Sequence, residues 1–533
     1  MVVVGGGTAG SVVAGRLAES GHEVLVLEAG PDYGSFEHGR WPADLLDART
    51  LPLSHDWNYA GHGWGGHSLS FHRARVIGGC SAHNGCSQMV GWGADYDMWA
   101  KDTPGWSAAT LRPMFEVTRE RMRMRVWGQE EIQPLQVAFV EAARSMGLHV
   151  SWDFDDLDAG ESVGCAPVNI VGGIRWNSSF AYLDPVRGAG SLSVADGVAV
   201  DRVLTSGGRA IGVQVRHREE TLRVSADQVV VCGGAYGTPE ILLRSGIGPA
   251  DELRSAGIGV AADLPGVGGN LHDHPVAQLE FEGTRALAAD LADFARQHWL
   301  PEEQAVAKIA STVCDGPFDL HVFPWVEQDA TLAQGWKVVL PVGLVAPRSR
   351  GRVTLRSSGP FATGDIDHGY LRDQADVRAL ADGVRWAQEL VGSSPTLARY
   401  LGRALSAPRP GDDAVTTWIR RRHQHYWHPA GSCRMGGPSD PAAVVGSGGA
   451  VHGIHGLSVA DASIFPQIPR ATIAWPVVAA GERIAQSLSQ RLAAGRNTGV
   501  PPGERVPAPG AVLPNAQSLG RVHRDGPRRT TGC

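Results

Sequence analysis

The sequence has few cysteines and none of the spacings that metal sites use. Its 533 residues contain seven cysteines, and no two of them form a C-x-x-C pair. A disulfide framework or a structural zinc site is therefore not expected, and we interpret the cysteines as reduced thiols. The sequence predicts no metal site.

Long apolar runs and an excess of positive charge are also missing. No apolar run reaches the roughly 18 residues that suggest a membrane span, and no leader segment is expected before the first strand. The net charge of −7 gives no basic footprint, so nucleic acid is not an expected partner. We expect a cytoplasmic protein without membrane attachment, and we leave open whether it forms a homodimer.

A dinucleotide-binding pattern is present at the N-terminus, in the run VVVGGGTAGSVVAGRLAESGHEVLVLEAG (2–30). It predicts a buried strand, a glycine turn, a helix over 11–20 and a second strand that ends on an acid. The glycines would admit a pyrophosphate to the helix N-terminus, and the acid would accept hydrogen bonds from a ribose. The predicted contact residues are Gly5, Gly7, Thr8, Ala9, Gly10 and Glu28.

Five further motifs follow in a fixed order. They are RVIGGCSAHNG…ADYDMWA (75–100), GGAYGTPEILLRSGIGPADEL (233–253), PGVGGNLHDHP (265–275), HPAGSCRMGG (428–437) and VHGIHGLSVADASIFPQIP (451–469). Together with the glycine turn they closely resemble the glucose–methanol–choline (GMC) family of FAD-dependent oxidoreductases. The resemblance runs from residue 2 to about residue 490.

The resemblance implies an α/β fold with two parts: a Rossmann-type FAD-binding domain and a second, α+β substrate domain with an antiparallel sheet. Residues 493–533 are rich in Pro, Gly and Arg without apolar periodicity, which predicts a disordered tail. The expected FAD-binding segments are 1–145, 191–275 and 426–492, and the expected substrate segments are 146–190 and 276–425.

A histidine stands in a loop of small residues, GGCSAHNGC, that includes Gly78 and Gly79. This loop resembles that of the choline oxidases of the family, in which the matching histidine is bonded covalently to the 8α-methyl of the flavin. His83 is therefore predicted to be bonded to FAD in the same way. The alternatives without such a bond are a histidine that packs beside FAD and one that is hydrogen-bonded to a nearby backbone group. The resemblance implies that Asn84 is a polar contact near the flavin.

Two later segments are expected to complete the cofactor site. Gly233 and Gly234 follow a buried strand and would allow close approach of the backbone, and residues 198–203, Val203 among them, either flank the adenine or belong to the sheet core. The resemblance places Asp461, together with Ala462, near the ribityl chain and pyrophosphate. A helix cap is the alternative role of this aspartate.

His428 matches the catalytic histidine of the family. A base beside the hydroxyl can take its proton as hydride leaves the alcohol carbon, and imidazole suits this role because its unperturbed pKa lies near 6.5. A structural histidine is the alternative. His423 and His425 lie nearby in the sequence, and we expect them at the surface or in the pocket wall.

One position departs from the family pattern. Ala474 stands where most relatives carry a second catalytic Asn or His. Three interpretations remain open: Thr472 or a histidine from 423–425 replaces the missing group, the substrate positions itself through its own polar groups, or the protein has lost alcohol oxidation. The third would give a non-redox lyase that keeps its flavin, or an inactive homologue.

The predicted activity is the FAD-dependent oxidation of an alcohol to an aldehyde or ketone. The electron acceptor, dioxygen or another, and the identity of the alcohol stay open. Phe323 and Trp325 stand beside Glu327, and aromatic groups beside a carboxylate can hold a quaternary ammonium. The same run is also typical of a sheet edge with a solvated acid.

Overall fold

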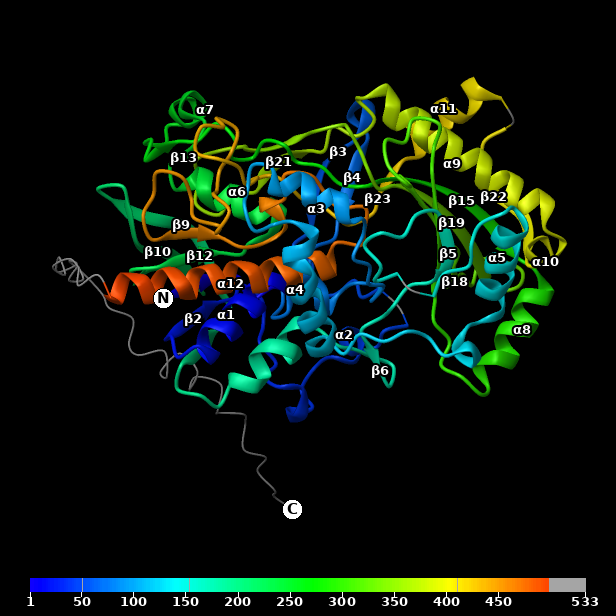
Figure 1. Ribbon diagram of the computed structural model, residues 1–533, viewed down its shortest axis with the longest axis horizontal. Helices are drawn as coiled ribbons and strands as arrows, with labels where there is room; N and C mark the ends of the chain where they lie inside the picture. The colour runs from blue at the N-terminus through cyan, green and yellow to red at the C-terminus, as the bar shows by residue number, and fades with distance from the viewer. Residues whose placement is uncertain (50, 153, 410, 498–533) are drawn as a thin grey trace, which may run out of the picture.

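Two lobes lie side by side in the computed structural model, which describes residues 1–497 except 50, 153 and 410 (Figure 1). One lobe is built on a parallel sheet and the other on a larger antiparallel sheet. The predicted tail lies mostly outside the described residues. Its first part, 493–497, belongs instead to the long helix α12 (Ala474–Asn497), so the predicted boundary falls inside a helix.

The parallel sheet contains strands from three distant parts of the chain. Its order is β24-β12-β1-β2-β8, and every neighbouring pair is parallel. Short β-branched runs form the central strands, as expected where helices or other elements cover both faces. The bounds are β1 (Val2–Val4), β2 (Val24–Leu27), β8 (Leu192–Ala195), β12 (Val229–Val231) and β24 (Leu457–Val459).

Helices α1 (Thr8–Glu19) and α12 pack against each other in this lobe (Figure 1). A Cβ atom on Gly481 would lie 2.9 Å from Val12, so a glycine is needed where the two helices approach each other most closely. Helix α1 begins three residues before the predicted start at Ser11, because Gly7 is already its N-cap. Its first turn therefore includes three of the predicted contact residues, Thr8, Ala9 and Gly10.

A three-stranded antiparallel meander extends this lobe, with β9 (Val198–Ser206), β10 (Arg209–His217) and β11 (Glu220–Ser225). The turn between β9 and β10 is made by Gly207 and Gly208, which both have positive φ angles, 55° and 72°. Two consecutive residues of this kind are typical of a tight hairpin turn.

The second lobe is built on an eight-stranded antiparallel sheet. Its main path is β22-β15-β19-β17-β16-β5, with β18 paired to β19 and β23 paired to β15. The bounds are β5 (Ser162–Cys165), β15 (Pro275–Gly283), β16 (Ala305–Ile309), β17 (Leu320–Val322), β18 (Trp325–Gln328), β19 (Trp336–Leu344), β22 (Leu401–Ser406) and β23 (Gln424–His425).

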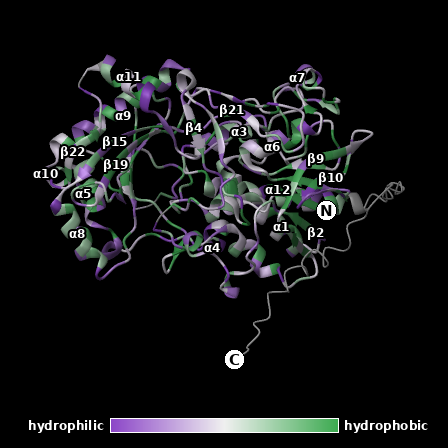
Figure 2. Cartoon of the chain, turned by 180° about the vertical axis from the view of Figure 1, so that it is seen from behind, coloured by the Kyte–Doolittle hydropathy of each residue, from purple (hydrophilic) through white to green (hydrophobic). Residues whose placement is uncertain are grey.

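Alternate residues of these strands face two different environments. Ala305, Ala307 and Ile309 of β16 belong to the core under the helices, whereas Val306 belongs to a smaller cluster with Phe323. Successive side chains of a strand point to opposite faces, so one face carries the helices and the other is free to form a site. Figure 2 shows hydrophilic and hydrophobic residues mixed along the covering helices. These are α5 (Pro134–Ser145), α8 (Arg285–Ala295), α9 (Gln374–Ser393), α10 (Pro395–Ala398) and α11 (Asp412–Arg422).

Segments distant in the sequence join the two lobes. A four-stranded sheet of order β20-β21-β3-β4 pairs residues near 60 with residues near 366. Helix α5 packs on β5 and β16, although the predicted division at residue 145 assigns it to the FAD-binding part. The remaining elements are β3 (Tyr59–His62), β4 (Ser68–Phe71), β6 (Ile170–Val171), β7 (Ile174–Arg175), β13 (Ile247–Gly248), β14 (Ala262–Asp263), β20 (Arg352–Leu355), β21 (Gly364–Asp367), α2 (Ala43–Leu46), α3 (Gly93–Ala100), α4 (Ala108–Arg121), α6 (Gly234–Arg244) and α7 (Ala250–Ser255).

Candidate functional site

A cavity of about 720 Å³ is lined by residues of both lobes. We call the part lined by Gly5, Thr8, Glu28 and Val198 the nucleotide end, and the part lined by His428 and residues of β16 and β18 the substrate end. The predicted residues that line the cavity are Gly5, Gly7, Thr8, Ala9, Glu28, Gly79, His83, Asn84, Gly233, Gly234, His428, Asp461 and Ala462.

Three predicted residues do not line the cavity, and each has a packing role. A Cβ atom on Gly10 would lie 1.9 Å from the carbonyl oxygen of Gly5, so this glycine lets α1 pack on the turn after β1. Gly78 has a φ of 83° and donates its N–H to the carbonyl of Gly6 at 2.7 Å. Val203 is buried in β9, and its N–H donates to Ser245.

The N-terminus of α1 is suited to an anion. Gly7 supplies no capping side chain, and the first turn contains no acidic residue, so the N–H groups of this turn keep their hydrogens for a ligand. Gly79 approaches this turn so closely that a Cβ atom on it would lie 2.6 Å from the Cα of Gly7. Because Gly7 and Gly79 carry no side chains, a phosphate group has room at the N-terminus of α1.

Glu28, at the end of β2, is held by two backbone groups. Its Oε2 accepts from the N–H of Gly6 at 2.8 Å, and its Oε1 accepts from the N–H of Gly30 at 2.7 Å. Burial raises the pKa of Glu28 although both N–H groups favour the charged form. Each carboxylate oxygen has a second acceptor position, so the side chain can still receive hydroxyl hydrogens at the cavity wall.

Asp461 both caps a helix and lines the cavity. Its Oδ1 accepts from the N–H of Ser463 at 2.8 Å, which caps the short 3₁₀ helix Ala462–Ile464. Its Oδ2 accepts from the N–H of Gly234 at 2.9 Å and from the hydroxyl of Thr238 at 2.6 Å. The helix-cap role is therefore present, and the aspartate also ties the β12–α6 turn to the last cofactor motif. Its contact with the ribityl chain and pyrophosphate stays a prediction.

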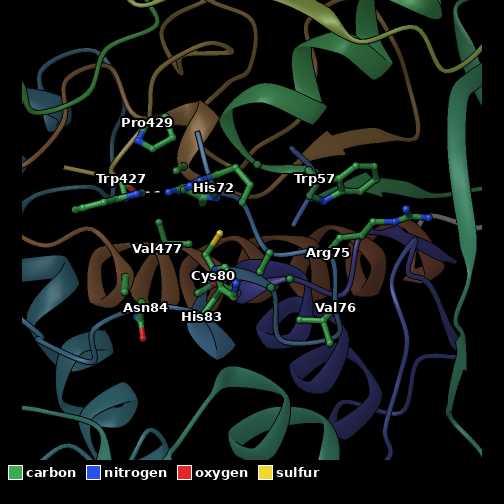
Figure 3. A pocket seen from close by; sticks show the side chains of 18 of the residues that line it. Trp57, His72, Arg75, Val76, Cys80, His83, Asn84, Trp427, Pro429 and Val477 are labelled. Carbon is green, nitrogen blue, oxygen red and sulfur yellow. Dashed lines mark hydrogen bonds between the residues drawn. The ribbon is translucent and has the colours of Figure 1, made fainter. Parts of the chain in front are cut away.

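Sequence reasoning missed several arginine and aromatic residues of the nucleotide end. The guanidinium of Arg216 lies 4.1 Å from the ring centroid of Phe361, and that of Arg75 lies 5.1 Å from the ring of Trp57. Trp57 and Arg75 lie side by side in Figure 3. All four residues line the cavity. No local motif marks them, because their positions depend on how separate strands and loops pair.

His83 lies in the loop GGCSAHNGC, and its ring lines the cavity near Cys80 (Figure 3). Its Nε2 donates to the carbonyl of Ser54 at 2.8 Å, so Nδ1 carries the lone pair of the neutral ring. Burial lowers the pKa of His83 to about 4. The neighbouring Asn84 accepts the N–H of Cys86 at 3.2 Å, and Cys86 has a φ of 65°, so the loop turns sharply directly after these two residues.

His428 lines the substrate end and is paired with a second imidazole. Its Nδ1 lies 3.0 Å from Nδ1 of His274, and its backbone N–H donates to Asp273 at 2.9 Å. Burial lowers the pKa of His428 well below its usual value and that of His274 to about 3, so both rings are neutral at pH 7. His274 was not singled out from the sequence, although it lies in the quoted motif PGVGGNLHDHP.

The surroundings of Ala474 show which side chains are placed to replace the Asn or His that most relatives carry there. Ala474 lines the cavity, and the indole N–H of Trp475 donates to Thr118 at 2.7 Å, so that large ring is engaged away from the cavity. The hydroxyl of Thr472 donates to the carbonyl of Ser87 at 3.0 Å. The predicted substitutes His423 and His425 do not line the cavity and bond to the backbone at Arg420 and Ser70.

The aromatic run predicted beside Glu327 reaches the substrate end, but the charge of this acid is compensated. Phe323 and Trp325 line the cavity with ring centroids 6.1 Å apart. Glu327 of β18 lies opposite Lys337 of β19 and forms an ion pair with it. Because Lys337 already compensates the charge of Glu327, the hypothesis that Glu327 holds a cationic ligand loses its support.

The described part of the chain contains neither a disulfide nor a metal cluster. Six cysteines fall within it, and all six are free thiols. No group of three or more His, Cys, Asp or Glu residues there has an arrangement that could hold a metal ion. Among the described helices, none has the length and apolar character needed to cross a membrane.

Comparisons with known proteins agree with this geometry. Residues 1–276 match the N-terminal family model of the GMC oxidoreductases, and residues 347–481 match the C-terminal one. An oxygen-dependent choline dehydrogenase of Brucella anthropi is 30% identical over 93% of this chain and 96% of its own length, and one of Rhizobium johnstonii is 31% identical over 91% and 95%. The crystal structure of pyridoxine 4-oxidase from Mesorbium loti has a TM-score of 0.81 at 28% identity, covering 92% of this chain and 99% of that one.

The nucleotide end fits the cofactor of this family. GMC oxidoreductases bind FAD, and the uncapped helix, the facing glycines and the carboxylate of Glu28 offer donors and acceptors for phosphate and ribose groups. Gly5, Gly7, Thr8 and Glu28 would hold the nucleotide half, with the His83 loop near the flavin. The two-lobed fold and the family-wide motifs lead to one conclusion: the chain belongs to the GMC oxidoreductase family and is an FAD-dependent alcohol oxidoreductase.

Proposed function

We propose that the protein oxidises an alcohol to an aldehyde or ketone with His428 as the base that takes the hydroxyl proton. The observation that carries the proposal is the neutral His428 ring, which lines the same cavity as the nucleotide cradle and is paired to His274. Bound FAD supplies the acceptor for the hydride. The chain supplies the base, the pocket and the exclusion of water.

The pairing with His274 is compatible with the tautomer that a base requires. Of two neutral rings with facing Nδ1 atoms, one must donate and the other accept. If His428 donates, its Nε2 keeps a lone pair for the substrate hydroxyl, and His274 carries its hydrogen on Nε2. Nε2 of His274 is buried and has no hydrogen-bond partner among the described residues, so the other contacts of this ring do not determine which of the two rings donates. His274 acts as a positioning residue.

Asp273 supports the same arrangement from the backbone side. Its carboxylate accepts the N–H of His428 and, at 3.1 Å, the hydroxyl of Tyr370. Burial raises its pKa to about 6, so it is charged at pH 7 and lies close to the imidazole pair. A negative charge there stabilises the imidazolium that forms when His428 accepts the proton.

The alternative function, a non-redox lyase or a catalytically altered homologue, rests on the presence of Ala474. A methyl group cannot orient a developing alkoxide, and a missing oriented donor of this type costs on the order of 2.7–4 kcal/mol of barrier. The proposal requires that water or a polar group of the substrate occupies this position. A non-redox lyase or a catalytically altered homologue would need no such group.

Anaerobic mixing with alcohols separates the two functions. An oxidoreductase loses the yellow absorbance of its flavin when an alcohol is added without oxygen, whereas a lyase keeps it. Retention of the oxidised spectrum across primary, secondary and amino alcohols would contradict the proposal. Readmission of oxygen with detection of hydrogen peroxide then tests dioxygen as the acceptor, which the name of the Brucella relative suggests for that protein.

We also propose that His83 is attached to the flavin. The support is its place in the cavity wall and its neutral ring, because a neutral imidazole nitrogen is a nucleophile. Since Nε2 is bonded to the carbonyl of Ser54, a C–N bond would form at Nδ1, or at Nε2 after that hydrogen bond is released, in place of one C–H bond of the flavin 8α-methyl. The methyl and the imidazole would each lose a proton, and the two electrons of the C–H bond would pass through the flavin to the electron acceptor of the proposed oxidation. The alternative, a ring that packs beside FAD, keeps the Ser54 contact unchanged.

A further inference from the structure

The proposed base follows a residue with an unusual backbone conformation. Trp427 has a φ of 60°, in the left-handed region that bulky side chains rarely adopt. Such a conformation is strained, and it persists only where the surrounding contacts fix it. Because Trp427 directly precedes His428 and both line the cavity, the contacts that fix it also set the direction in which the His428 side chain leaves the backbone.

Regular backbone pairing is present on both sides of this residue. The N–H of Tyr426 donates to the carbonyl of His274 at 3.0 Å, at the end of the β15–β23 ladder. Farther along, His272 and Ala430 exchange two backbone hydrogen bonds of 3.1 Å and 2.9 Å. Between these two positions, both polar atoms of one peptide group are bonded to charged side chains instead.

The peptide group that joins Trp427 to His428 is held at both ends by opposite charges. Its carbonyl accepts from Nη1 of Arg73 at 2.9 Å, and its N–H donates to Oδ1 of Asp273 at 2.9 Å. Hydrogen bonds in which one partner is ionised are roughly twice as strong as neutral ones. The two bonds together fix the plane of this peptide and restrict the orientation of the His428 side chain.

Arg73 comes from another part of the chain, two residues after β4, and lines the cavity. Its backbone N–H donates to Asp56 at 2.8 Å, and its Nε donates to the carbonyl of His72. Burial works against its charge, but neighbouring acidic groups, Asp273 among them, raise the pKa of Arg73 above its usual value. The guanidinium is therefore charged and held in place. Trp427 and His72 lie on the same side of the pocket in Figure 3.

We propose that Arg73 is a positioning residue for the base: together with Asp273 it holds the peptide before His428 so that the ring faces the substrate hydroxyl. This inference rests on the proposed role of His428 and deepens it. Arg73 stands two residues before the motif RVIGGCSAHNG, and no sequence pattern connects it with a histidine more than 350 residues later.

The charge of Arg73 also acts on the protonation of the ring. Burial is the largest cause of the low pKa of His428, and His274 and Arg73 follow. The neighbouring imidazoles are neutral at pH 7 because burial lowers their pKa values, whereas the guanidinium keeps its charge. Asp273 opposes this effect, since a carboxylate favours the imidazolium. The titratable and charged groups around His428 are Arg73, Asp273, His274, His321, His425 and Tyr426.

Two substitutions separate the geometry from the charge. Arg73→Met removes both, whereas Arg73→Lys keeps the charge and loses the planar guanidinium. With a neutral alcohol at pH 8, Arg73→Met should slow anaerobic flavin reduction by at least about tenfold, because a misplaced base loses its orientation, and should change the Kd of the alcohol by less than about threefold. The acid limb of the rate should move to higher pH in Arg73→Met. Arg73→Lys should be slowed as well, but with its acid limb at the wild-type position.

Arg483→Met is the matched control, because that guanidinium also donates to a backbone carbonyl, Gly105 at 3.0 Å, but does not line the cavity. Its reduction rate and acid limb should equal those of the wild type. If Arg73→Met does not fold, Arg73→Lys still tests the inference through a lower rate with an unchanged acid limb. Wild-type rates in the Arg73 variants, a loss confined to the Kd of the alcohol, or a rate loss that Arg483→Met shares would overturn the inference.

A double substitution tests whether Arg73 acts through the histidine. Added to His428→Ala, Arg73→Met should lower the reduction rate by less than about threefold further, because no base remains to be positioned. Losses that multiply would show that Arg73 acts on the substrate or the flavin directly, and the positioning role would be wrong. A wild-type rate in His428→Ala alone would remove the proposed base, whereas a slow His428→Ala beside Arg73 variants with wild-type rates would remove only this inference.

Discussion

The two ends of the cavity are built from different materials. The nucleotide end is mostly backbone: a helix N-terminus without a capping side chain, glycines that face each other, and one carboxylate held by two N–H groups. The substrate end is made of side chains, with an imidazole pair, stacked rings and the acids Glu302 and Glu303. A site built from backbone groups depends on the path of the chain and little on which side chains are present. A site built from side chains changes its chemistry when those side chains are replaced. Family members can therefore share one cofactor while they differ in substrate.

The largest effect is expected from His428→Ala. Removal of a general base typically slows the chemical step by about 10²- to 10⁴-fold, so the rate of anaerobic flavin reduction should fall by at least about 10²-fold. FAD content should not change, because the nucleotide end does not use this side chain. Stopped-flow reduction measures the rate, and His452→Gln, whose ring bonds to the carbonyl of Gly436, is the control. A variant with wild-type rates would end the role of His428 as the base.

A substitution at the nucleotide end can weaken FAD binding without changing the residues that take part in the reaction. In Gly10→Ala the new methyl would lie 1.9 Å from the Gly5 carbonyl oxygen, so α1 must shift on β1. Overpacking of this kind costs about 1–3 kcal/mol, and we expect a lower melting temperature and less bound FAD per protein. Molecules that keep FAD should reduce it at the wild-type rate.

Gly392→Ala is the matched control for this change, because a Cβ atom at that helical position meets nothing within 4 Å. Its melting temperature should equal or slightly exceed the wild-type value, since alanine favours helix over glycine. Normal FAD content in Gly10→Ala would show that the turn adapts to the methyl group.

The acid side of the pH profile tests the electrostatics of the substrate end. The folded pKa of His428 lies below its unperturbed value of about 6.5, so the ring stays neutral and active as the pH falls through 6.5. We expect kcat/KM to be level between pH 8 and 6.5 and to fall only below that range. The profile should be measured with a neutral alcohol, so that the charge of Glu302 and Glu303 does not change the attraction of the substrate to the cavity. A decline centred at or above pH 6.5 would show that the imidazole is not shielded from protonation.

The smallest change in turnover is expected from His83→Ala, although the change in flavin retention should be complete. The nucleotide end still binds FAD in the folded variant, but acid precipitation should release all of the flavin into the supernatant. The wild type should keep its yellow colour in the pellet. Wild-type protein that loses its flavin to acid would leave His83 as a packing residue bonded to Ser54.

The difference between the two ends also explains what the sequence could predict. The fold class and the cofactor followed from contiguous motifs, and both are confirmed. Gly5, Gly7 and Glu28 lie within one βαβ unit, so local spacing determines their geometry. Gly10 and Gly78 were assigned contacts with the cofactor, but neither lines the cavity and both approach other parts of the backbone. A glycine pattern does not show whether a ligand or another backbone segment approaches it.

The substrate end could be predicted only in part. His428 stands in a recognisable motif, but its partner His274 comes from a segment more than 150 residues earlier, and the strand pairing that brings them together has no local signature. The same holds for Glu303, which precedes β16, and for Lys337, which compensates Glu327 across two strands. Charge compensation is a property of the folded sheet.

The order of strands in the parallel sheet has a consequence for biosynthesis. β24, at one edge, and α12, which packs on α1, come after nearly all of the other described elements. Asp461 and His428 also belong to this late part of the chain. During translation the N-terminal βαβ unit can form early, but the cofactor site stays open until the last segments leave the ribosome, because distant contacts close last. We therefore expect stable flavin retention only after the last segments have folded, and a chain truncated before residue 457 should retain no flavin.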